Sequence, residues 1–140
     1  MVSFECVRQP AGEPLRPEGA RRVGQMRRLG RASLRYWGCE EAVTEEAAVL
    51  ISELVTNALQ HGRGPHIGFA ISCSEAAVRI EVGGDSSELP TLCRDPATDA
   101  ERGRGLLLVA ELSDAWGTSP DGKRTWCELK LCDDADGPPQ

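Results

Sequence analysis

Three polar residues recur at four-residue intervals within the stretch ELVTNALQHG: Glu53, Asn57 and His61. In an α-helix this spacing stacks side chains along one side, with a drift of about 40° per step. Glu53 and Asn57 fall at the border of the apolar stripe, so we expect both to be half-buried. A carboxylate and an amide so placed can supply a general base and an oxygen ligand for Mg²⁺. An ordinary exposed glutamate beside a helix-capping asparagine is the alternative for this segment alone.

A second candidate site lies in RGRGLLLV, which runs from Arg102 to Val109. Gly103 and Gly105 let backbone N–H groups approach an anion, and the start of the following helix favours phosphate. Arg102 and Arg104 add positive charge. The segment is neither a P-loop, since no GK[ST] follows, nor a Rossmann fingerprint, since a third glycine and a preceding strand are missing. A plain flexible glycine hinge is equally compatible with it.

Two helices are expected to position the first candidate. One begins at Thr44 as N-cap and ends at His61-Gly62, with apolar residues at helical spacing. Before it, an arginine-rich helix is expected from Glu18 to Trp37, ended by Gly38 and Cys39. Its predicted inner side comprises Val23, Met26, Leu29 or Gly30, Ser33 or Leu34, and Trp37.

Strand patterns occupy much of the remaining chain. Val2–Val7 alternates as an edge strand would, and His66–Cys73 and Ala77–Val82 predict a hairpin across the short SEA turn. A polar stretch of about 20 residues follows, and a loop of that length is usually functional or disordered. A short helix in GLLLVAEL and a terminal hairpin in AWGTSPDGKRTWCELKL, turning at ProAspGly, complete the pattern.

This order favours an α+β fold, a two-layer sandwich with a mixed, mostly antiparallel sheet and helices on one face. The regular βα alternation of a doubly wound sheet is absent. We expect one domain over residues 1–132 and a disordered tail over residues 133–140, DDADGPPQ.

Four segments occur together in one order: ELVTNALQHG, GGDSSELP after a strand, GRGLLLV, and a late TWCEL strand. This combination resembles the N, G1, G2 and G3 boxes of the GHKL ATP-binding superfamily. More narrowly, it resembles the small anti-sigma-factor serine kinases and their stand-alone relatives. The resemblance covers about Arg16 to Leu131. It implies a Bergerat-type sandwich that binds ATP and Mg²⁺.

The resemblance also implies roles for individual residues. Glu53 matches the base that activates the attacking hydroxyl or water, and Asn57 matches the Mg²⁺ ligand. Gly103 and Gly105 match the hinge and the phosphate-facing turn at the end of a lid, and Thr125 loosely matches a threonine near adenine. The same boxes place four further residues at the nucleotide: His61, Arg102, Arg104 and Leu106.

The G1 segment departs from the family pattern. In the family, an aspartate that binds the adenine amino group usually stands two residues beyond the last strand valine. Here Gly84 occupies that position after Val82, and Asp85 comes one residue later. A one-residue shift in a strand turns a side chain to the opposite face. We expect a bulge at Gly83 and Gly84 to restore the direction of Asp85, the predicted adenine acceptor.

Charge is unevenly distributed along the chain. The net charge of −6 argues against nonspecific nucleic-acid binding, yet Arg16 to Arg35 contains seven arginines and one acid, Glu18. A basic helix of this kind could dock an acidic partner, such as a sigma factor or an anti-anti-sigma (STAS-type) protein. A solvated helix face is about as compatible. A homodimer is a further expectation.

Six cysteines are scattered at wide intervals without a CxxC or His-containing metal spacing. With no secretory signal, a disulfide framework is rejected, and we expect small buried residues or idle thiols. No apolar run is long enough to span a membrane, so a cytoplasmic location is expected.

The leading hypothesis is therefore a Mg²⁺-dependent protein serine/threonine kinase of the anti-sigma type, acting on an anti-anti-sigma partner. The alternative is a non-catalytic nucleotide-binding module that sequesters a partner. A nucleotide-free interaction domain is a third hypothesis, which the sequence favours less than the other two. Glu53 favours the kinase, whereas the shift of Asp85 favours the binding module.

Overall fold

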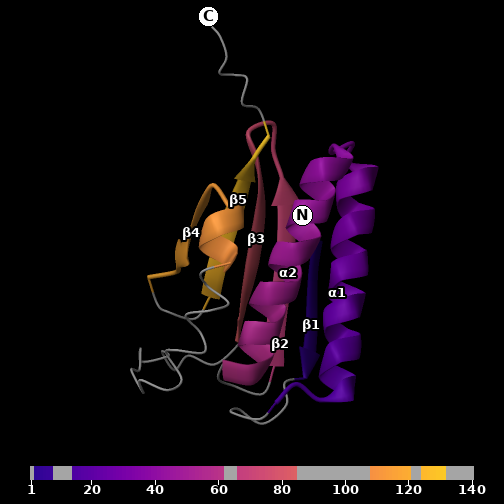
Figure 1. Ribbon diagram of the computed structural model, residues 1–140, viewed down its shortest axis with the longest axis vertical. Helices are drawn as coiled ribbons and strands as arrows, with labels where there is room; N and C mark the ends of the chain where they lie inside the picture. The colour runs from indigo at the N-terminus through magenta and orange to yellow at the C-terminus, as the bar shows by residue number, and fades with distance from the viewer. Residues whose placement is uncertain (1, 8–13, 62–65, 85–107, 121–123, 132–140) are drawn as a thin grey trace, which may run out of the picture.

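The computed structural model describes residues 2–7, 14–61, 66–84, 108–120 and 124–131. Two long helices and five strands lie in these ranges, and residues 108–112 are also helical. In chain order the elements are β1 (Val2–Val7), α1 (Pro17–Tyr36), α2 (Glu41–His61), β2 (His66–Cys73), β3 (Ala77–Gly84), β4 (Ala115–Thr118) and β5 (Arg124–Lys130) (Figure 1). The predicted tail, residues 133–140, lies outside the described residues.

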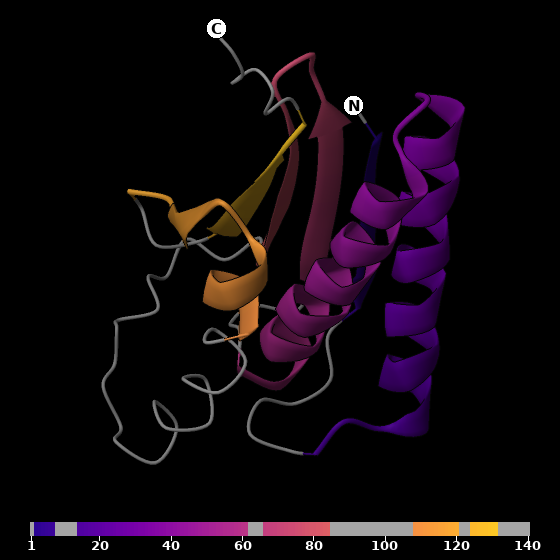
Figure 2. The ribbon, with the colours of Figure 1, turned by 45° about the horizontal axis from the view of Figure 1, so that its top comes forward.

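The strands form one sheet in the order β1-β2-β3-β5-β4, and α1 and α2 cover one of its faces (Figures 1 and 2). This confirms the α+β two-layer sandwich, and it confirms β1 as an edge strand. The expectation of a mixed sheet is wrong for the described strands, because all four neighbouring pairs are antiparallel. The cause at β1 and β2 is that α1 and α2 run antiparallel, so the chain enters β2 in the direction opposite to β1.

The core lies between the helices and the sheet. Because side chains alternate across a strand, every second residue of the central strands points at the helices. Each fully buried aliphatic side chain contributes about 1.5–3 kcal/mol through its removal from water. Among the strand residues whose burial is described, the buried apolar side chains are Ile67, Phe69 and Ile71 of β2, Val78, Ile80 and Val82 of β3, and Cys127 and Leu129 of β5.

The boundaries of α1 lie within one residue of the prediction. Pro17 occupies the first turn, where its missing N–H is tolerated. The helix ends before Trp37, and Gly38 follows with φ of +85°, a conformation that glycine adopts without strain. Of the predicted inner residues, Leu29 and Trp37 are half-buried and the others are buried.

The start of α2 differs from the prediction. The helix begins at Glu41, three residues before the expected N-cap Thr44. Thr44 is fully buried in the first turn, where its Oγ1 donates a 3.0 Å hydrogen bond to the carbonyl oxygen of Glu40. A hydroxyl that bonds back to the residue four positions earlier belongs inside a helix rather than at its cap.

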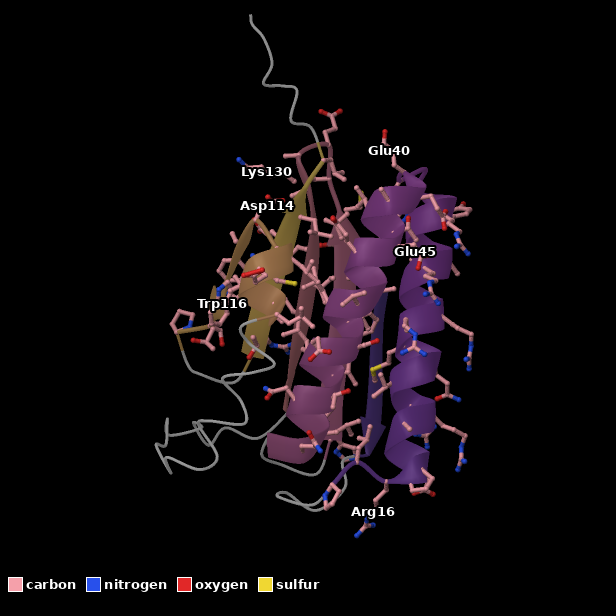
Figure 3. The ribbon with its side chains drawn as sticks, in the orientation of Figure 1. Arg16, Glu40, Glu45, Asp114, Trp116 and Lys130 are labelled. Carbon is pink, nitrogen blue, oxygen red and sulfur yellow. The ribbon has the colours of Figure 1, made fainter. Side chains whose placement is uncertain are left out.

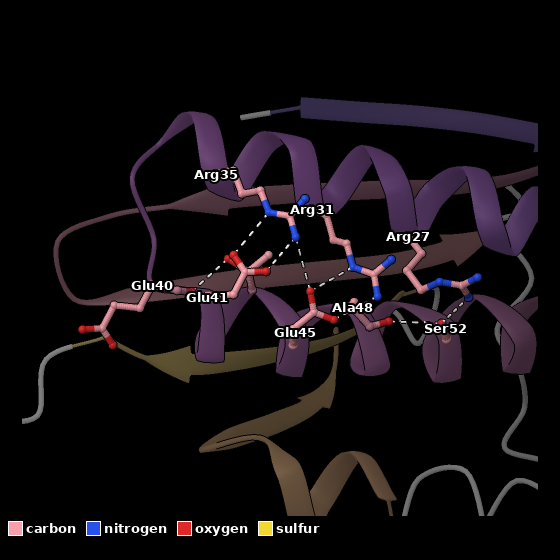
Figure 4. Close-up of polar contacts among 9 residues, drawn as sticks. Arg27, Arg31, Arg35, Glu40, Glu41, Glu45, Ala48 and Ser52 are labelled. Carbon is pink, nitrogen blue, oxygen red and sulfur yellow. Dashed lines mark hydrogen bonds and ion pairs between the residues drawn. The ribbon is translucent and has the colours of Figure 1, made fainter.

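A row of arginines on α1 binds α2 (Figure 4). These side chains stand four residues apart and therefore share one side of the helix. Arg27 Nη1 donates to Ser52 Oγ at 2.9 Å, Arg31 Nη2 to Glu45 Oε1 at 2.9 Å, and Arg35 Nη2 to Glu41 Oε2 at 2.6 Å. Single exposed ion pairs stabilise little. Together, however, the three contacts fix the rotation of α2 relative to α1.

On the face of the sheet without helices, Arg79 of β3 joins its own strand to β5. Its Nε lies 2.8 Å from Glu81 Oε2, and its Nη1 lies 2.9 Å from Glu128 Oε2. The guanidinium carbon also stands 4.4 Å from the ring centroid of Trp126, a cation–π distance. These contacts reinforce the β3–β5 pairing.

The outer strand β4 is tied to the far end of β5. The backbone N–H of Lys130 donates a 2.6 Å hydrogen bond to Asp114 Oδ2 (Figure 3). The antiparallel pairing of β4 with β5 confirms the predicted terminal hairpin, although its turn residues 121–123 lie outside the described residues. Within the described part of the chain, no helix is long and apolar enough to cross a membrane.

Candidate functional site

Three element ends meet at one end of the molecule: the carboxyl ends of α2 and β3 and the start of β5 (Figure 1). The pairing of β3 with β5 places Val82 opposite Thr125 and Gly83 opposite Arg124. Candidate residues from the helix layer and from the sheet layer are therefore carried to the same region, although they are far apart in the sequence.

The contact between Arg27 and Ser52 settles which way Glu53 faces. Ser52 points at α1, and the next residue is rotated by about 100° around the helix axis. Glu53 and Asn57 consequently lie on the side of α2 away from α1. Figures 1 and 2 show the helical residues 108–112 beside α2 on that side. Both side chains are half-buried, as the sequence predicted.

Burial raises the pKa of the Glu53 carboxyl above its ordinary value. Desolvation does this because it disfavours the charged form. Within the described residues, Glu53 forms no hydrogen bond or ion pair. No described residue therefore occupies its oxygens, and its affinity for a proton is greater than that of an exposed glutamate. Such a carboxyl can act as a general base.

Asn57 and Thr125 are also half-buried, and among the described residues neither side chain has a hydrogen-bond partner. Thr125 alternates with the buried Cys127, so it points toward the helix layer. Partly buried polar groups are normally satisfied by protein, water or ligand. No described residue therefore prevents these two side chains from contacting a bound molecule, Asn57 from the helix layer and Thr125 from the sheet.

The predicted bulge at Gly83 and Gly84 is wrong for the described part of the strand. β3 continues through Gly84, with Gly83 opposite Gly68 and Gly84 opposite Ile67 in an unbroken register. Gly83 is held on its other side by Arg124 of β5. Glycine permits a bulge but does not require one, and pairing to two neighbours keeps the strand regular. Gly84 therefore shares the helix-facing side with Val82.

The other predicted residues are not placed. Asp85, Arg102, Gly103, Arg104, Gly105 and Leu106 lie outside the described residues. His61 is the last residue of α2, and the position of its side chain is likewise outside the description. These assignments therefore stay predictions.

The short helix predicted after the two glycines is present at residues 108–112. Val109 is fully buried in the core, whereas Leu108 is 38% exposed. The segment that follows the Gly-x-Gly sequence is thus anchored in the protein through Val109.

A family model for the histidine kinase-like ATPase domain matches residues 16–129. The chain belongs to that family. The match spans α1 to β5 and includes Glu53, Asn57, the Gly-x-Gly segment and Thr125. It confirms the GHKL part of the resemblance, and an ATPase domain implies ATP as ligand. No sequence among curated proteins matches the chain.

The hydrogen bond from Arg27 to Ser52, which orients α2 of this ATPase domain directly beside Glu53, was not predicted from the sequence. A usable signal was present. Arg27, Arg31 and Arg35 recur at four-residue intervals, and the next helix carries acceptors at Glu41, Glu45 and Ser52. Two antiparallel helices with these spacings bring donors opposite acceptors.

Proposed function

We propose that this ATPase domain transfers the γ-phosphoryl group of Mg·ATP to a serine or threonine of an anti-anti-sigma protein of the STAS type. The observation that carries the proposal is the carboxyl of Glu53. It is half-buried, its pKa is raised by burial, and it lacks a partner among the described residues. A carboxyl with these properties can accept a proton from a bound hydroxyl group.

In this proposal Glu53 accepts the proton of the attacking hydroxyl. The amide oxygen of Asn57, one turn further along α2, binds Mg²⁺. Within the described residues no group of three or more His, Cys, Asp or Glu could hold a metal. A single amide oxygen fits Mg²⁺ that keeps water and phosphate oxygens as its other ligands. Mg·ATP, when bound, would supply the phosphoryl group, and its Mg²⁺ would neutralise part of the phosphate charge. Thr125 would contact the adenine.

We propose that α1, the basic helix, binds the partner protein through fewer of its arginines than the sequence alone suggests. Arg27 and Arg31 were expected to belong to this surface, but both are bonded to α2. Arg21, Arg22 and Arg28 remain exposed on α1. We assign these three to an acidic surface of a sigma factor or an anti-anti-sigma protein. Long-range attraction of this kind mainly raises the association rate.

One observation favours the alternative of a nucleotide-binding module without catalysis. The regular β3 ladder leaves Gly84 at the helix-facing position where the resemblance expects an aspartate. A site without that acceptor would hold adenine less selectively. Sequestration of a partner would then depend on α1 rather than on phosphoryl transfer.

Calorimetric titration with Mg·ATP, Mg·ADP and Mg·GTP tests the nucleotide claim. We expect adenine nucleotides to bind and GTP to bind at least tenfold more weakly. Failure of all three would remove both the kinase and the nucleotide-binding module, leaving a nucleotide-free interaction domain. Incubation with candidate anti-anti-sigma proteins then distinguishes the first two. Formation of phosphoserine or phosphothreonine supports the kinase, whereas ATP binding without transfer supports the module.

Reversal of charge at Arg21 and Arg28 tests the docking surface. The double variant Arg21→Glu, Arg28→Glu should bind the partner at least tenfold more weakly and bind Mg·ATP as the parent does. The matched control is Lys130→Glu, an exposed lysine at the end of β5 remote from the candidate site and outside α1. Equal losses in the two variants would contradict a specific role for α1.

A further inference from the structure

Two thiols meet where the helix layer joins the sheet. Cys39 lies in the connection between α1 and α2, and Cys73 is the last residue of β2. Their Sγ atoms are 3.7 Å apart, and both residues are half-buried. Cys73 Sγ also lies 3.6 Å from the carbonyl oxygen of Ser74.

The backbone on both sides of this contact is fixed. The N–H of Cys39 donates to the carbonyl oxygen of Leu34 at 2.9 Å, which closes the end of α1. Cys73 is paired with Val78, and the N–H of the next residue, Ser74, donates to Ala77 at 2.9 Å. A disulfide requires the sulfur atoms to approach to roughly 2.05 Å. Rotation of two cysteine side chains supplies most of that movement.

We infer that Cys39 and Cys73 form a reversible oxidation site that is closed by thiol–disulfide exchange with a small disulfide such as oxidised glutathione. One protein thiolate attacks a sulfur of the small disulfide, giving a mixed disulfide and releasing one small thiol. The second protein thiolate attacks the protein sulfur of the mixed disulfide and releases the second small thiol. The two protein sulfurs are oxidised, the small disulfide is reduced, and the two protons pass to the released thiolates.

The surroundings of the two thiols set the pH dependence of the exchange. Burial, and then the contact with Cys73, raise the pKa of Cys39 to about 11. The exchange should therefore be faster at alkaline pH, where more of the thiol is ionised. Whichever of the two thiols attacks first, the other closes the bond because it stands beside the resulting mixed disulfide. Cys127 is fully buried in the core, and burial raises its pKa to about 12, so it does not compete.

The bond would enclose the whole of α2 and β2 in one covalent loop, and it would hold the turn between the helices against the β2–β3 hairpin. Closing a loop of this size restricts the unfolded chain and stabilises the fold. Glu53 lies twelve residues beyond the start of α2, or about 18 Å along the helix. Oxidation should thus raise stability and leave nucleotide affinity unchanged.

Peptide mapping tests the inference on the full, unmodified chain. After incubation with excess oxidised glutathione at pH 8.5, free thiols are blocked and the protein is digested with trypsin. Cleavage after Arg35, Arg63 and Arg79 yields peptides 36–63 and 64–79, each with one cysteine. We expect these two peptides to be joined under non-reducing conditions and separated by reductant. Recovery of both peptides unlinked, or linked only to other cysteines, would overturn the inference.

A thermal readout provides the second arm. The oxidised protein should melt roughly 5–15 °C higher than the reduced protein. Cys39→Ser and Cys73→Ser should each abolish that difference, whereas Cys132→Ser, near the carboxyl end, should retain it. A difference that survives in either of the first two variants would assign the stabilisation to another pair. Because peptide mapping uses the unmodified chain, it tests for the bond between Cys39 and Cys73 even if a variant folds poorly.

Discussion

Gly30 of α1 lies so close to Ile51 of α2 that a β-carbon on the glycine would overlap the Cδ1 atom of the isoleucine. The same β-carbon would lie 3.9 Å from Ile71 Cδ1 of β2. Two helices and the sheet thus converge on a position that has room only for glycine. The packing of α2, which carries Glu53 and Asn57, depends on this close approach.

Gly30→Ala should destabilise the protein by about 1–2 kcal/mol, because overpacking a filled core outweighs the gain of up to about 1 kcal/mol in helix propensity. Urea denaturation checks the value. Gly24→Ala is the matched control on the same helix. Its added carbon would lie 3.6 Å from a guanidinium nitrogen of Arg27 and from one of Arg28, which is an ordinary van der Waals contact, so this variant should be neutral or stabilised.

The cause can be tested in a double variant. Ile51→Val removes the atom that the new β-carbon would overlap, so Gly30→Ala should cost much less in that background. Equal costs in the two backgrounds would show that Ile51 is not the source of the strain.

Glu53→Gln separates kinase from binding module. It keeps the size of the side chain but removes the base, so phosphoryl transfer should fall by about 10²–10⁴-fold. Mg·ATP affinity and partner binding should persist, since Asn57 and the arginines of α1 are unchanged. Transfer is followed as phosphoserine or phosphothreonine on the partner. Transfer at the parental rate would exclude Glu53 as the base.

The same variant has a consequence for stability. Burial raises the pKa of Glu53 in the folded protein above its unfolded value of about 4.3. Between the unfolded and the folded pKa of Glu53, the folded state therefore binds more protons than the unfolded state. The free energy of unfolding consequently falls as the pH rises through the folded pKa. Glutamine carries no charge and avoids this loss.

We therefore expect Glu53→Gln to melt at a higher temperature than the parent at pH 7, with the gap closing below about pH 4. Calorimetric melts at the two pH values measure it. A gap of the same size at both values would assign the effect to packing rather than to charge.

Asn57→Ala tests the metal ligand. The side chain borders the core without filling it, so the fold should survive with a loss of less than about 1 kcal/mol. Affinity for ATP in the presence of Mg²⁺ should fall at least tenfold, whereas affinity with EDTA should change little. Calorimetry with and without the metal measures both. An unchanged response to Mg²⁺ would make the assignment of Asn57 wrong.

The main elements of the fold could be predicted from the sequence because hydrophobic spacing reflects burial. Ile67, Phe69 and Ile71 alternate, and the buried residues of α2 recur every three or four positions. The start of α2 was misplaced because its first turn, from Glu41, has no apolar period, and Thr44 is as suitable inside a helix as at a cap.

The details of the site depend on tertiary contacts and were harder to predict. The half-buried position of Glu53 follows from its place beside the apolar stripe, whereas the absence of a partner for it among the described residues does not. The glycines after Val82 allow a bulge, but pairing with both β2 and β5 excludes it in the described ladder. The contact between Cys39 and Cys73 joins a helix turn to a strand end 34 residues away, and no local pattern encodes it.

The β3–β5 pairing, reinforced by Arg79, Glu128 and Trp126, also divides the chain into two contiguous pieces. Among the described strands, β1, β2 and β3 come before residue 85 and β4 and β5 come after residue 107, so the pairing joins an earlier and a later part of the chain. A chain severed between Gly84 and Leu108 would retain the seven residue pairs that join β3 to β5 and the core contacts of Val109. The two pieces should therefore reassemble when mixed, which makes the domain a candidate for fragment complementation, with recovery of the fold reporting on the encounter of two fused proteins.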